Sequence, residues 1–290
     1  MPHNARGRGI LLALVSSAGF STLGLFAKFV YGQGFSVAGT LAWRFTLAAV
    51  FLWVVVLAAR RPLPKKVWPV LLLGLVGFSP QAGLYFLTLR FLDPGITSVL
   101  LYTYPSFVVL FGFVLWKKKP TRIQLAALAL SLAGCVVAFW KSGSYPAAGV
   151  ALGIAVGVSY AAYLVAGEKV LAGVDSISGT ALVMTVAACV YWVAAIASGG
   201  VKLPDTGAAI GGLACIALLA TVIPIVTLFA SMGLIGAADT SLVSTLEPVL
   251  TITLSAIFLG ERLGTAQLAG AVLVLSAVLI LALSERKKAA

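Results

Sequence analysis

The sequence has few charged residues, few cysteines and a single histidine, and each shortage excludes a class of protein. Only 10% of its 290 residues are Asp, Glu, Lys or Arg, whereas a soluble domain contains about 25%. A soluble globule of this composition would expose large apolar patches with few charges to keep it in solution. Three cysteines exclude a disulfide-stabilised secreted domain. The hydrophobic fraction of 61% leaves an integral membrane protein as the remaining class.

Several kinds of reactive site are also missing. The only histidine is His3, and no Cys, His and carboxylate residues are spaced to hold a metal. No glycine-rich loop followed by Lys is present to bind a nucleotide phosphate, which excludes ATP-driven pumping by this chain. No nucleophile has a base beside it. We therefore expect no metal, no cofactor and no enzymatic activity.

Ten apolar stretches are long enough to cross a bilayer as helices, which requires about 20 residues each. Their unbroken apolar runs differ from the alternating segments of about 10 residues that build a membrane barrel. The expected fold is therefore an all-α membrane protein with ten transmembrane helices. The stretches cover approximately residues 9–30, 36–59, 67–89, 95–116, 121–140, 147–167, 176–198, 207–231, 238–259 and 264–284.

The basic residues are distributed unevenly between the two sides of the membrane. With ten spans both termini face one side, and that side collects Arg6, Arg8, Arg60, Arg61, Lys65, Lys66, Lys117, Lys118, Lys119, Arg122, Lys169, Arg286, Lys287 and Lys288. The other side collects Lys28, Arg90, Lys141, Lys202 and Arg262. Because excess Lys and Arg stays in the cytoplasm, both termini are expected there. The net charge of +12 is thus explained by the membrane topology and by contact with the lipid bilayer. No nucleic acid partner is expected.

The chain contains an internal repeat. At a shift of 143 residues, Thr97-Ser98…Pro105…Gln124-Leu125-Ala126 falls on Thr240-Ser241…Pro248…Gln267-Leu268-Ala269. We predict one repeat in residues 1–143 and a second in residues 144–290. Each holds five spans, an odd number, so the second copy should be inverted relative to the first. Inverted repeats are typical of alternating-access transporters, whose substrate site lies near mid-membrane where the repeats meet.

Four prolines lie inside predicted spans, two in each repeat. Proline removes a backbone hydrogen bond and kinks a helix, and in lipid such breaks persist where they face protein or a water-filled cavity. Each could be a static kink, but the matched positions favour hinges. The residues are Pro80, Pro105, Pro224 and Pro248.

The segment Leu246-Glu247-Pro248…Phe258-Leu259-Gly260-Glu261-Arg262-Leu263 resembles the end of an EamA repeat, from the drug/metabolite transporter superfamily. The first repeat departs from that pattern, with Thr103-Tyr104-Pro105 and Lys117-Lys118 where glutamates often stand. Overall the chain is most similar to bacterial YddG-type amino acid exporters. That resemblance implies export of aromatic and other neutral amino acids across the bacterial inner membrane.

Two ionisable residues within the spans are the main candidates for a functional site. Arg44 could hold a substrate carboxylate or a backbone carbonyl inside the bundle, or it could reach outward to the interface. Glu247 could couple transport to protons or bind an ammonium group, or it could cap the backbone freed beside Pro248. The first two spans of each repeat align at a shift of 140 residues, which places Gly9, Ser36 and Gly39 on Gly149, Ser176 and Gly179. At this shift the equivalent of Arg44 is Met184, so its role is asymmetric.

Polar and aromatic residues well inside the spans complete the predicted substrate site. A buried Tyr hydroxyl needs a partner, and Ser98 and Tyr102, like Ser241 and Thr245 in the second repeat, share one helix face. The predicted cavity is lined by spans one, three, four, six, eight and nine. The predicted substrate-binding residues are Trp43, Arg44, Ser79, Gln81, Tyr85, Ser98, Tyr102, Tyr160, Tyr163, Ser241 and Thr245, with Glu247 as the coupling residue.

The favoured interpretation is a secondary exporter of amino acids or similar small metabolites that works by rocking of the two halves. An exporter of lipophilic cations with Glu247 reading the charge is the alternative within the same superfamily. An intramembrane lipid-modifying enzyme lacks the nucleophile it would need, and a channel lacks a ring of carbonyls or carboxylates. The sequence leaves the oligomeric state open, and a monomer is consistent with it.

Overall fold

The structure is a computed structural model that describes residues 3–117, 120–139 and 145–289. Every regular element in these ranges is helical, which confirms the expected fold class. Nine helical segments are long and apolar enough to cross a membrane, and the helix Arg122–Ala138 is a shorter apolar one. Together they match the ten expected spans. Lys118, Lys119 and Lys141 and the side chain of Ser241 lie outside the described part.

Helix bounds agree with the predicted spans to within a few residues, but several spans are divided. The first half comprises α1 (His3–Ser21), α2 (Leu23–Gly32), α3 (Val37–Ala58), α4 (Trp68–Leu72), η1 (Leu73–Phe78), α5 (Ser79–Thr88), α6 (Pro94–Leu101), α7 (Tyr104–Trp116) and α8 (Arg122–Phe139). The second comprises α9 (Ala147–Val170), α10 (Ser176–Ala197), α11 (Gly207–Ala217), η2 (Leu218–Val222), α12 (Ile223–Ser244), α13 (Leu246–Leu259) and α14 (Thr265–Ala289).

The interruptions occur in equivalent spans of the two repeats. The third and eighth spans each contain a π-helical turn, η1 and η2, directly before Pro80 and Pro224. The fourth span is broken before Pro105, and the ninth is broken at Thr245, before Pro248. Each of the four prolines thus lies in the first turn of the helix that follows an interruption, where its missing N–H is tolerated. Whether these positions move as hinges stays a prediction.

Two further irregularities interrupt helices. One lies between the eighth and ninth spans, and the other divides the first span. Gly236 has φ 81° and ψ 163° inside α12, a backbone conformation that favours glycine. This residue therefore separates two helical pieces within α12. The first span is divided at Thr22, whose hydroxyl donates to the Gly19 carbonyl at 2.7 Å, whereas the equivalent α9 is continuous.

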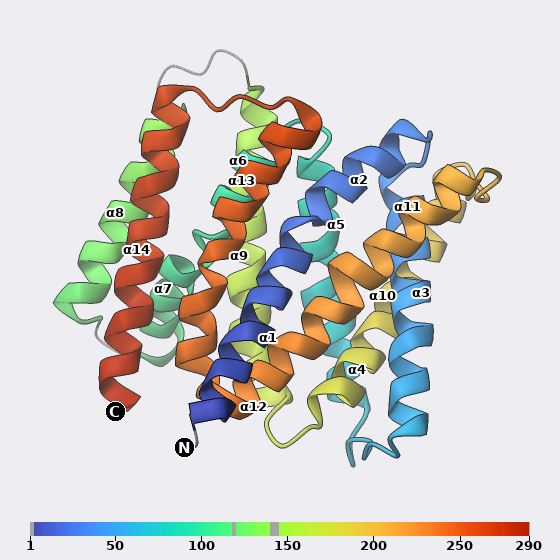
Figure 1. Ribbon diagram of the computed structural model, residues 1–290, viewed down its shortest axis with the longest axis horizontal. Helices are drawn as coiled ribbons and strands as arrows, with labels where there is room; N and C mark the ends of the chain where they lie inside the picture. Colours follow the sequence, from blue (N-terminus) through green and yellow to red (C-terminus); the bar gives the residue numbers. More distant parts are fainter. Residues whose placement is uncertain (1–2, 118–119, 140–144, 290) are drawn as a thin grey trace.

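The two repeats are interleaved and do not form separate bodies. α3 packs along α10, α8 along α14 and α1 along α12, so each contact joins a helix of one repeat to a helix of the other. In Figure 1, α6, α7, α8, α13 and α14 form one side of the bundle, and α3, α4, α10 and α11 form the other. Any rocking motion must therefore occur between groups of helices drawn from both repeats.

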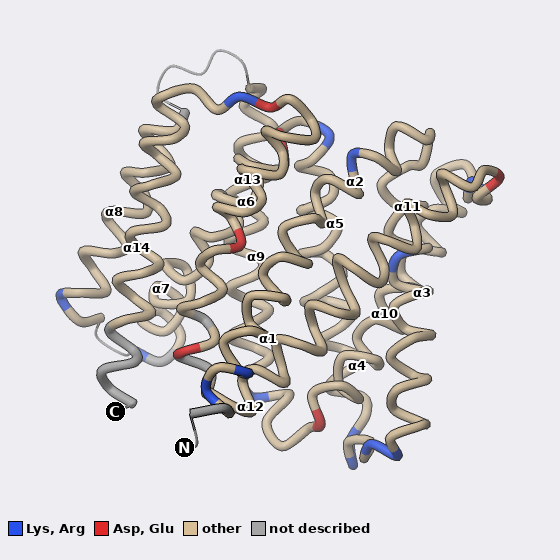
Figure 2. Tube along the Cα trace, in the orientation of Figure 1, with Lys and Arg blue, Asp and Glu red and all other residues tan. Residues whose placement is uncertain are grey.

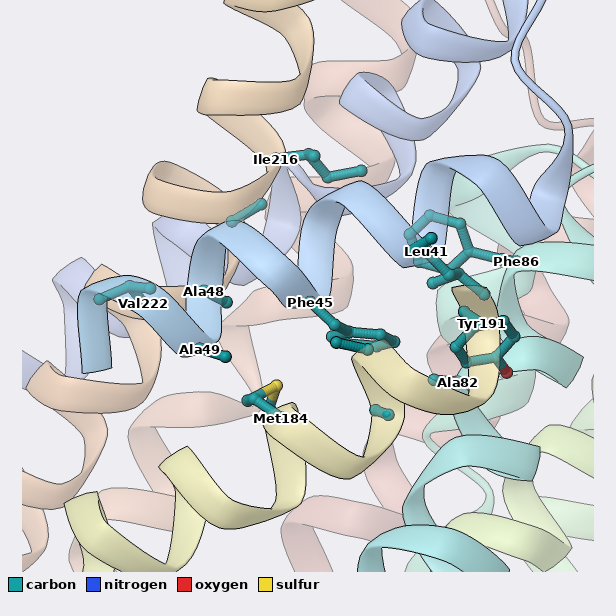
Figure 3. Packing of buried hydrophobic residues seen from close by; sticks show 14 of the residues in the cluster. Leu41, Phe45, Ala48, Ala49, Ala82, Phe86, Met184, Tyr191, Ile216 and Val222 are labelled. Carbon is teal, nitrogen blue, oxygen red and sulfur yellow. The ribbon is translucent and has the colours of Figure 1, made fainter. Parts of the chain in front are cut away.

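The largest apolar core lies between α3, α5, α10 and the η2 region. Figure 3 shows Phe45 of α3 directed toward α10, beside Tyr191, with Met184 farther along α10. Both chain termini lie at the same end of the bundle, here called the N/C end, and the opposite end is called the far end (Figure 1). Most charged residues lie at these two ends (Figure 2), as expected when the middle of the bundle faces lipid hydrocarbon.

Candidate substrate site at the helix interruptions

A buried arginine of α3 contacts the π-helical turn η2. Arg44 is 6% exposed, and its Nε donates a hydrogen bond to Thr221 Oγ1 at 2.9 Å. The Thr221 hydroxyl donates in turn to the carbonyl of Ile216, five residues earlier, at 2.8 Å. The guanidinium carbon lies 4.9 Å and 5.1 Å from the ring centroids of Phe45 and Phe86, within cation–π range. Arg44 therefore lies inside the bundle and connects α3 to the interruption of the eighth span.

The matching turn η1 is held in a corresponding way by α10. The Ser79 hydroxyl donates to the Gly74 carbonyl, again five residues earlier, at 2.8 Å. Tyr191 of α10 donates a hydrogen bond to the Ser79 carbonyl. Because α3 and α10 are the second and seventh spans, each π-turn contacts a polar side chain from the equivalent span of the other repeat. The two contacts differ in chemistry, since Arg44 carries a charge and Tyr191 does not.

The broken ends of the fourth and ninth spans are joined by a tyrosine. Tyr102, the residue directly after α6, donates its hydroxyl to the Ser244 carbonyl at 2.8 Å and to Glu247 Oε2 at 3.0 Å. The Ser244 carbonyl is the last of α12, where helical carbonyls have no partner within the helix. Glu247 lies in the first turn of α13. Tyr102 thus links one repeat to the interruption of the other through a backbone group and a carboxyl group.

The hydrogen bonds at Tyr102 depend on the proton of Glu247. A phenol has one hydrogen to donate, whereas Ser244 and an ionised Glu247 both offer acceptors only. If Glu247 is protonated, its hydroxyl can donate to the Tyr102 oxygen while Tyr102 donates to the Ser244 carbonyl. This arrangement satisfies all three groups. Loss of the proton makes the two acceptors compete for one hydrogen, so protonation of Glu247 is coupled to the contact between α6 and α12.

A cavity of about 250 Å³ extends from this junction toward the N/C end. Its lining includes the buried Tyr102 and the exposed Glu168, which lies two residues before the end of α9. It lies against the fourth, sixth, ninth and tenth spans, of which the tenth was not predicted to line a cavity. The lining residues are Tyr102, Tyr104, Pro105, Val108, Val109, Leu164, Val165, Glu168, Ser244, Val278, Leu281 and Ala282.

Tyrosines of α9 extend an aromatic row from this cavity into the bundle. The ring centroids of Tyr102 and Tyr104 are 5.9 Å apart, and Tyr160 lies 4.8 Å from Tyr104 in an edge-to-face arrangement. Tyr163 follows at 6.3 Å from Tyr160 and contacts Phe78 at 5.6 Å. The structure therefore brings together three of the four predicted tyrosines. The fourth, Tyr85 of α5, is buried and lies within electrostatic range of both Arg44 and Glu247.

Other predicted substrate-binding residues have their polar groups engaged elsewhere. The hydroxyls of Ser98 and Thr245 donate to carbonyls three residues earlier in their own helices, at 2.7 Å each. Gln81 is buried in α5, while the side chain of Ser241 lies outside the described part. Trp43 donates to the backbone carbonyl of Lys202 at the far end, at 3.2 Å, which separates it from the other candidates.

Sequence reasoning did not identify Thr221, Tyr191, Ser244 and Tyr104 as site residues. A signal was present for Thr221, because it stands three positions before Pro224 inside a span, as Ser79 stands one position before Pro80. Tyr191 gave no such signal, because its partner is a backbone carbonyl on a distant helix. Ser244 contributes its carbonyl and not its side chain, which no pattern of residue types reveals.

A comparison with known protein families identifies the family to which the chain belongs. The model of the EamA-like transporter family matches residues 7–140 and again residues 147–283. The chain belongs to the EamA-like transporter family. Membership makes it a membrane transporter and not an enzyme, and it includes the chain in the drug/metabolite transporter superfamily.

Individual relatives of this EamA-like transporter align with nearly the whole length of the chain. The Bacillus subtilis protein named uncharacterized transporter YcbK is 30% identical over 281 residues, covering 90% of this chain and 88% of its own. The Synechocystis protein named uncharacterized transporter sll1319 is 24% identical, covering 96% and 94%. A crystal structure aligns with a TM-score of 0.69 and 20% identity over 97% of this chain and 99% of the other. That likeness shows a shared fold.

At the far end of the EamA-like transporter, two carboxyl groups from different repeats lie close together. Asp93, just before α6, accepts a hydrogen bond from the Tyr145 hydroxyl at 2.7 Å. Burial and this hydrogen bond raise the pKa of Tyr145 above its ordinary value. Glu261 follows α13 and is close enough to Asp93 for their charges to repel. The connections before the fourth span and after the ninth therefore meet at this end.

The environment of Glu261 favours its protonated form. Burial raises the pKa of this carboxyl to about 7, and the negative charge of Asp93 acts in the same direction. Ser255, Lys28 and the backbone of Gly95 oppose the shift. The folded protein thus binds a proton at Glu261 at pH values where the unfolded chain, with an ordinary value of 4.5, has lost it.

The stability of the transporter should depend on pH through Glu261. Stabilisation by the protonated carboxyl is complete below pH 4.5 and is lost as the pH rises through about 7. Because the carboxyl is only half-buried, we expect the melting temperature to fall by only about 2 °C between pH 5 and pH 8. Glu261→Gln should remove this fall, as measured by thermal unfolding in detergent, whereas Asp205→Asn in an exposed loop should preserve it. An unchanged pH dependence in Glu261→Gln would contradict the assignment.

Proposed function

We propose that this EamA-like transporter is a secondary exporter of amino acids, aromatic and other neutral ones, of the YddG type. It would work by alternating access in the bacterial inner membrane, with both termini and the N/C end of the bundle in the cytoplasm. The excess of Lys and Arg assigned to the side of the termini supports that orientation. The cavity that reaches the N/C end would then receive substrate from the cytoplasm.

The observation that carries the proposal is a pair of ionisable residues, Arg44 and Glu247, at the interruptions of the eighth and ninth spans. Arg44 contacts the π-turn of the eighth span, and Glu247 begins the second half of the ninth. Tyr85 lies within electrostatic range of both. No Asp or Glu in the described part of the chain forms an ion pair with Arg44. A zwitterionic amino acid supplies the carboxylate that Arg44 lacks and the ammonium group that Glu247 can accept.

The buried positive charge of Arg44 favours an amino acid over a lipophilic cation as the substrate. A charged arginine inside the membrane costs about 2.5–3.5 kcal/mol on insertion scales, and a cationic substrate would add repulsion to that cost. Discontinuous helices with exposed backbone groups are the usual substrate-binding elements of secondary transporters. The aromatic row from Tyr102 to Tyr163 offers ring faces to an aromatic side chain.

Counterflow into proteoliposomes tests the substrate class. Purified protein is reconstituted with an internal excess of each unlabelled amino acid in turn, and uptake of the same labelled compound is followed. We expect transient accumulation for phenylalanine, tryptophan and smaller neutral amino acids, and none for aspartate or lysine. Accumulation of an organic cation such as tetraphenylphosphonium, with no amino acid transported, would overturn the proposal in favour of the cation exporter.

Glu247→Gln separates substrate movement from proton coupling. The glutamine amide can donate to the Tyr102 oxygen permanently, so the variant imitates protonated Glu247. We expect counterflow of phenylalanine to persist, while accumulation driven by a pH gradient falls at least about tenfold, because the proton can no longer be released. Asp205→Asn serves as a control and should lose neither activity. Accumulation equal to the unmodified protein would remove Glu247 from the coupling role.

A further inference from the structure

Two helices that end at the N/C end (Figure 1) are followed by basic residues in a backbone conformation that favours glycine. Arg60, after α3, has φ 48°, and Lys117, after α7, has φ 53°. In this left-handed region a side chain is costly, and helices that end in it usually place glycine there. Among the residues that the structure describes, no other non-glycine residue has a positive φ. The chain thus keeps basic side chains at these two ends at a cost to local stability.

The helix equivalent to α3 in the second repeat ends in the same backbone turn but with glycine. In both turns an N–H donates to the carbonyl five residues earlier, from Arg61 to Val56 at 2.9 Å after α3 and from Gly200 to Ala195 at 3.0 Å after α10. The residue before the donor is an arginine after α3, whereas after α10 it is Gly199, with φ 111°. The same turn is therefore built with a basic residue at the N/C end and with glycine at the far end.

Lys117 and its repeat equivalent show the same difference. The Lys117 N–H donates to the Gly112 carbonyl, and at the shift of 143 residues the Gly260 N–H donates to the Ser255 carbonyl. Gly260 has φ 67°. The dipole of a helix attracts a cation to its C-terminus at either end of the bundle, yet at the far end both positions hold glycine. The basic residues are therefore explained by an interaction on one side of the membrane and not by the helix dipole.

The loop between α3 and α4 carries several cations without an acidic partner. Arg61 pairs with Asp175 at 3.3 Å. Arg60, Lys65 and Lys66 are exposed, and no Asp or Glu in the described part of the chain forms an ion pair with them. Figure 2 shows basic residues gathered where α3 ends. Because this loop joins the second and third spans, its cations lie at the level of the lipid head groups.

Apolar side chains flank these cations. Leu57, in the last turn of α3, is 72% exposed, and Trp68, the first residue of α4, is 66% exposed. Leu63, within the loop, is exposed as well. Tryptophan at the end of a span is typical of the membrane interface. A soluble anion would contact only the cations, whereas a phospholipid would use both kinds of side chain.

We propose that the loop between α3 and α4 binds an anionic phospholipid, such as phosphatidylglycerol, from the leaflet at the N/C end. Arg60, Lys65 and Lys66 hold the phosphate, and Leu57 and Trp68 contact the acyl chains. Basic residues beside a span attract anionic lipids, and each of them adds to the attraction. The proposal is independent of which substrate the transporter carries.

The orientation of the protein in the membrane does not by itself account for Arg60. The Lys and Arg residues that set orientation can lie at any position near the ends of the spans, and Lys65 and Lys66 already supply such charges without a positive φ. A lipid site, in contrast, requires cations at fixed positions around one phosphate. A short loop held at both ends by helices provides such positions.

A lipid titration tests the site. Native mass spectrometry of the full-length protein, released from a neutral detergent, measures the affinity for the first lipid bound. Phosphatidylglycerol should bind about tenfold more tightly than phosphatidylcholine with the same acyl chains. Lys65→Ser/Lys66→Ser should remove most of this preference. The matched control Arg90→Ser/Arg262→Ser removes the same charge from exposed positions at the far end and should preserve it.

Three outcomes of this titration would overturn the proposal. One is an undiminished preference for phosphatidylglycerol in Lys65→Ser/Lys66→Ser. Another is an equal loss in Arg90→Ser/Arg262→Ser, which would show that net charge alone attracts the lipid. The third concerns glycerol 3-phosphate, which carries a phosphate without acyl chains and should not bind measurably. If it displaces phosphatidylglycerol at equal concentration, the ligand of the loop is a soluble anion.

Arg60→Gly separates lipid binding from local stability. Glycine relieves the left-handed backbone, so the melting temperature in detergent with phosphatidylcholine should rise by about 2 °C. The same variant should bind phosphatidylglycerol about three- to tenfold more weakly, because one of the three cations is lost. A lower melting temperature would show that the arginine stabilises the end of α3 by itself. Unchanged affinity for phosphatidylglycerol would contradict its role in the lipid site, whatever the melting temperature.

Discussion

Replacing Arg44 with methionine should sharply weaken amino acid transport while leaving the protein folded. Methionine is the residue at the equivalent position of the second repeat, Met184, which packs in the same apolar core. The variant removes the charge proposed to hold the substrate carboxylate. A hydrogen bond to a charged group contributes about 1.5–3 kcal/mol, so we expect the affinity for phenylalanine in counterflow to fall about 10- to 150-fold.

Stability should respond in the opposite direction from transport. An arginine within the membrane is costly, and methionine fills irregular core space well. Thr221 keeps its hydrogen bond to the Ile216 carbonyl in the variant, because that bond does not involve Arg44. We therefore expect a melting temperature equal to or above that of the unmodified protein. A large fall in melting temperature would show that Arg44 is mainly a structural clamp on η2.

A second substitution tests what the charge of Arg44 contributes. Arg44→Lys keeps the charge but cannot reproduce the planar guanidinium contact with Thr221, so transport should be partly retained. If the affinity for phenylalanine in counterflow is unchanged in Arg44→Met, the assignment of Arg44 to the substrate carboxylate is wrong.

The spans themselves could be predicted from the sequence because they follow from local hydrophobicity alone. The predicted stretch 36–59 became α3 at Val37–Ala58, and 176–198 became α10 at Ser176–Ala197. Bilayer thickness sets the length, and Gly, Pro and polar clusters set the ends. The prolines correctly marked where four spans are interrupted. They could not indicate that the third and eighth spans would form π-turns, because this depends on hydroxyl contacts with released carbonyls.

The interleaving of the repeats was beyond sequence reasoning. Two similar halves suggested two bodies with a cavity between them, yet α3 packs on α10 and α8 packs on α14. Which helix lies beside which is decided by side-chain packing across long sequence separations, and in a membrane small residues rather than hydrophobicity guide that choice. The contacts of Arg44 and Tyr191 with the π-turns of the opposite repeat follow from this interleaving.

The pairing of α8 with α14 depends on two glycines that face each other. A methyl group added at Gly134 would lie 2.8 Å from the Gly270 carbonyl oxygen, and one added at Gly270 would lie 2.6 Å from the Ala138 side chain. Ala127 and Ala277 are fully buried in a cluster contributed by the same two helices. Small residues at such crossings let helix backbones approach closely, which is a main source of helix association in membranes. The fifth and tenth spans are therefore joined by a contact that tolerates no added side chain.

Gly134→Val should consequently destabilise the protein more than any polar substitution discussed above. Overpacking in a core costs about 1–3 kcal/mol where side chains can adjust, and here a backbone carbonyl must move, so we expect at least about 3 kcal/mol. Thermal unfolding in detergent provides the measurement. Gly112→Val is the matched control, because nothing lies within 4 Å of a methyl group added there, and it should cost about 1 kcal/mol or less. Equal melting temperatures for the two variants would show that α8 and α14 can separate freely.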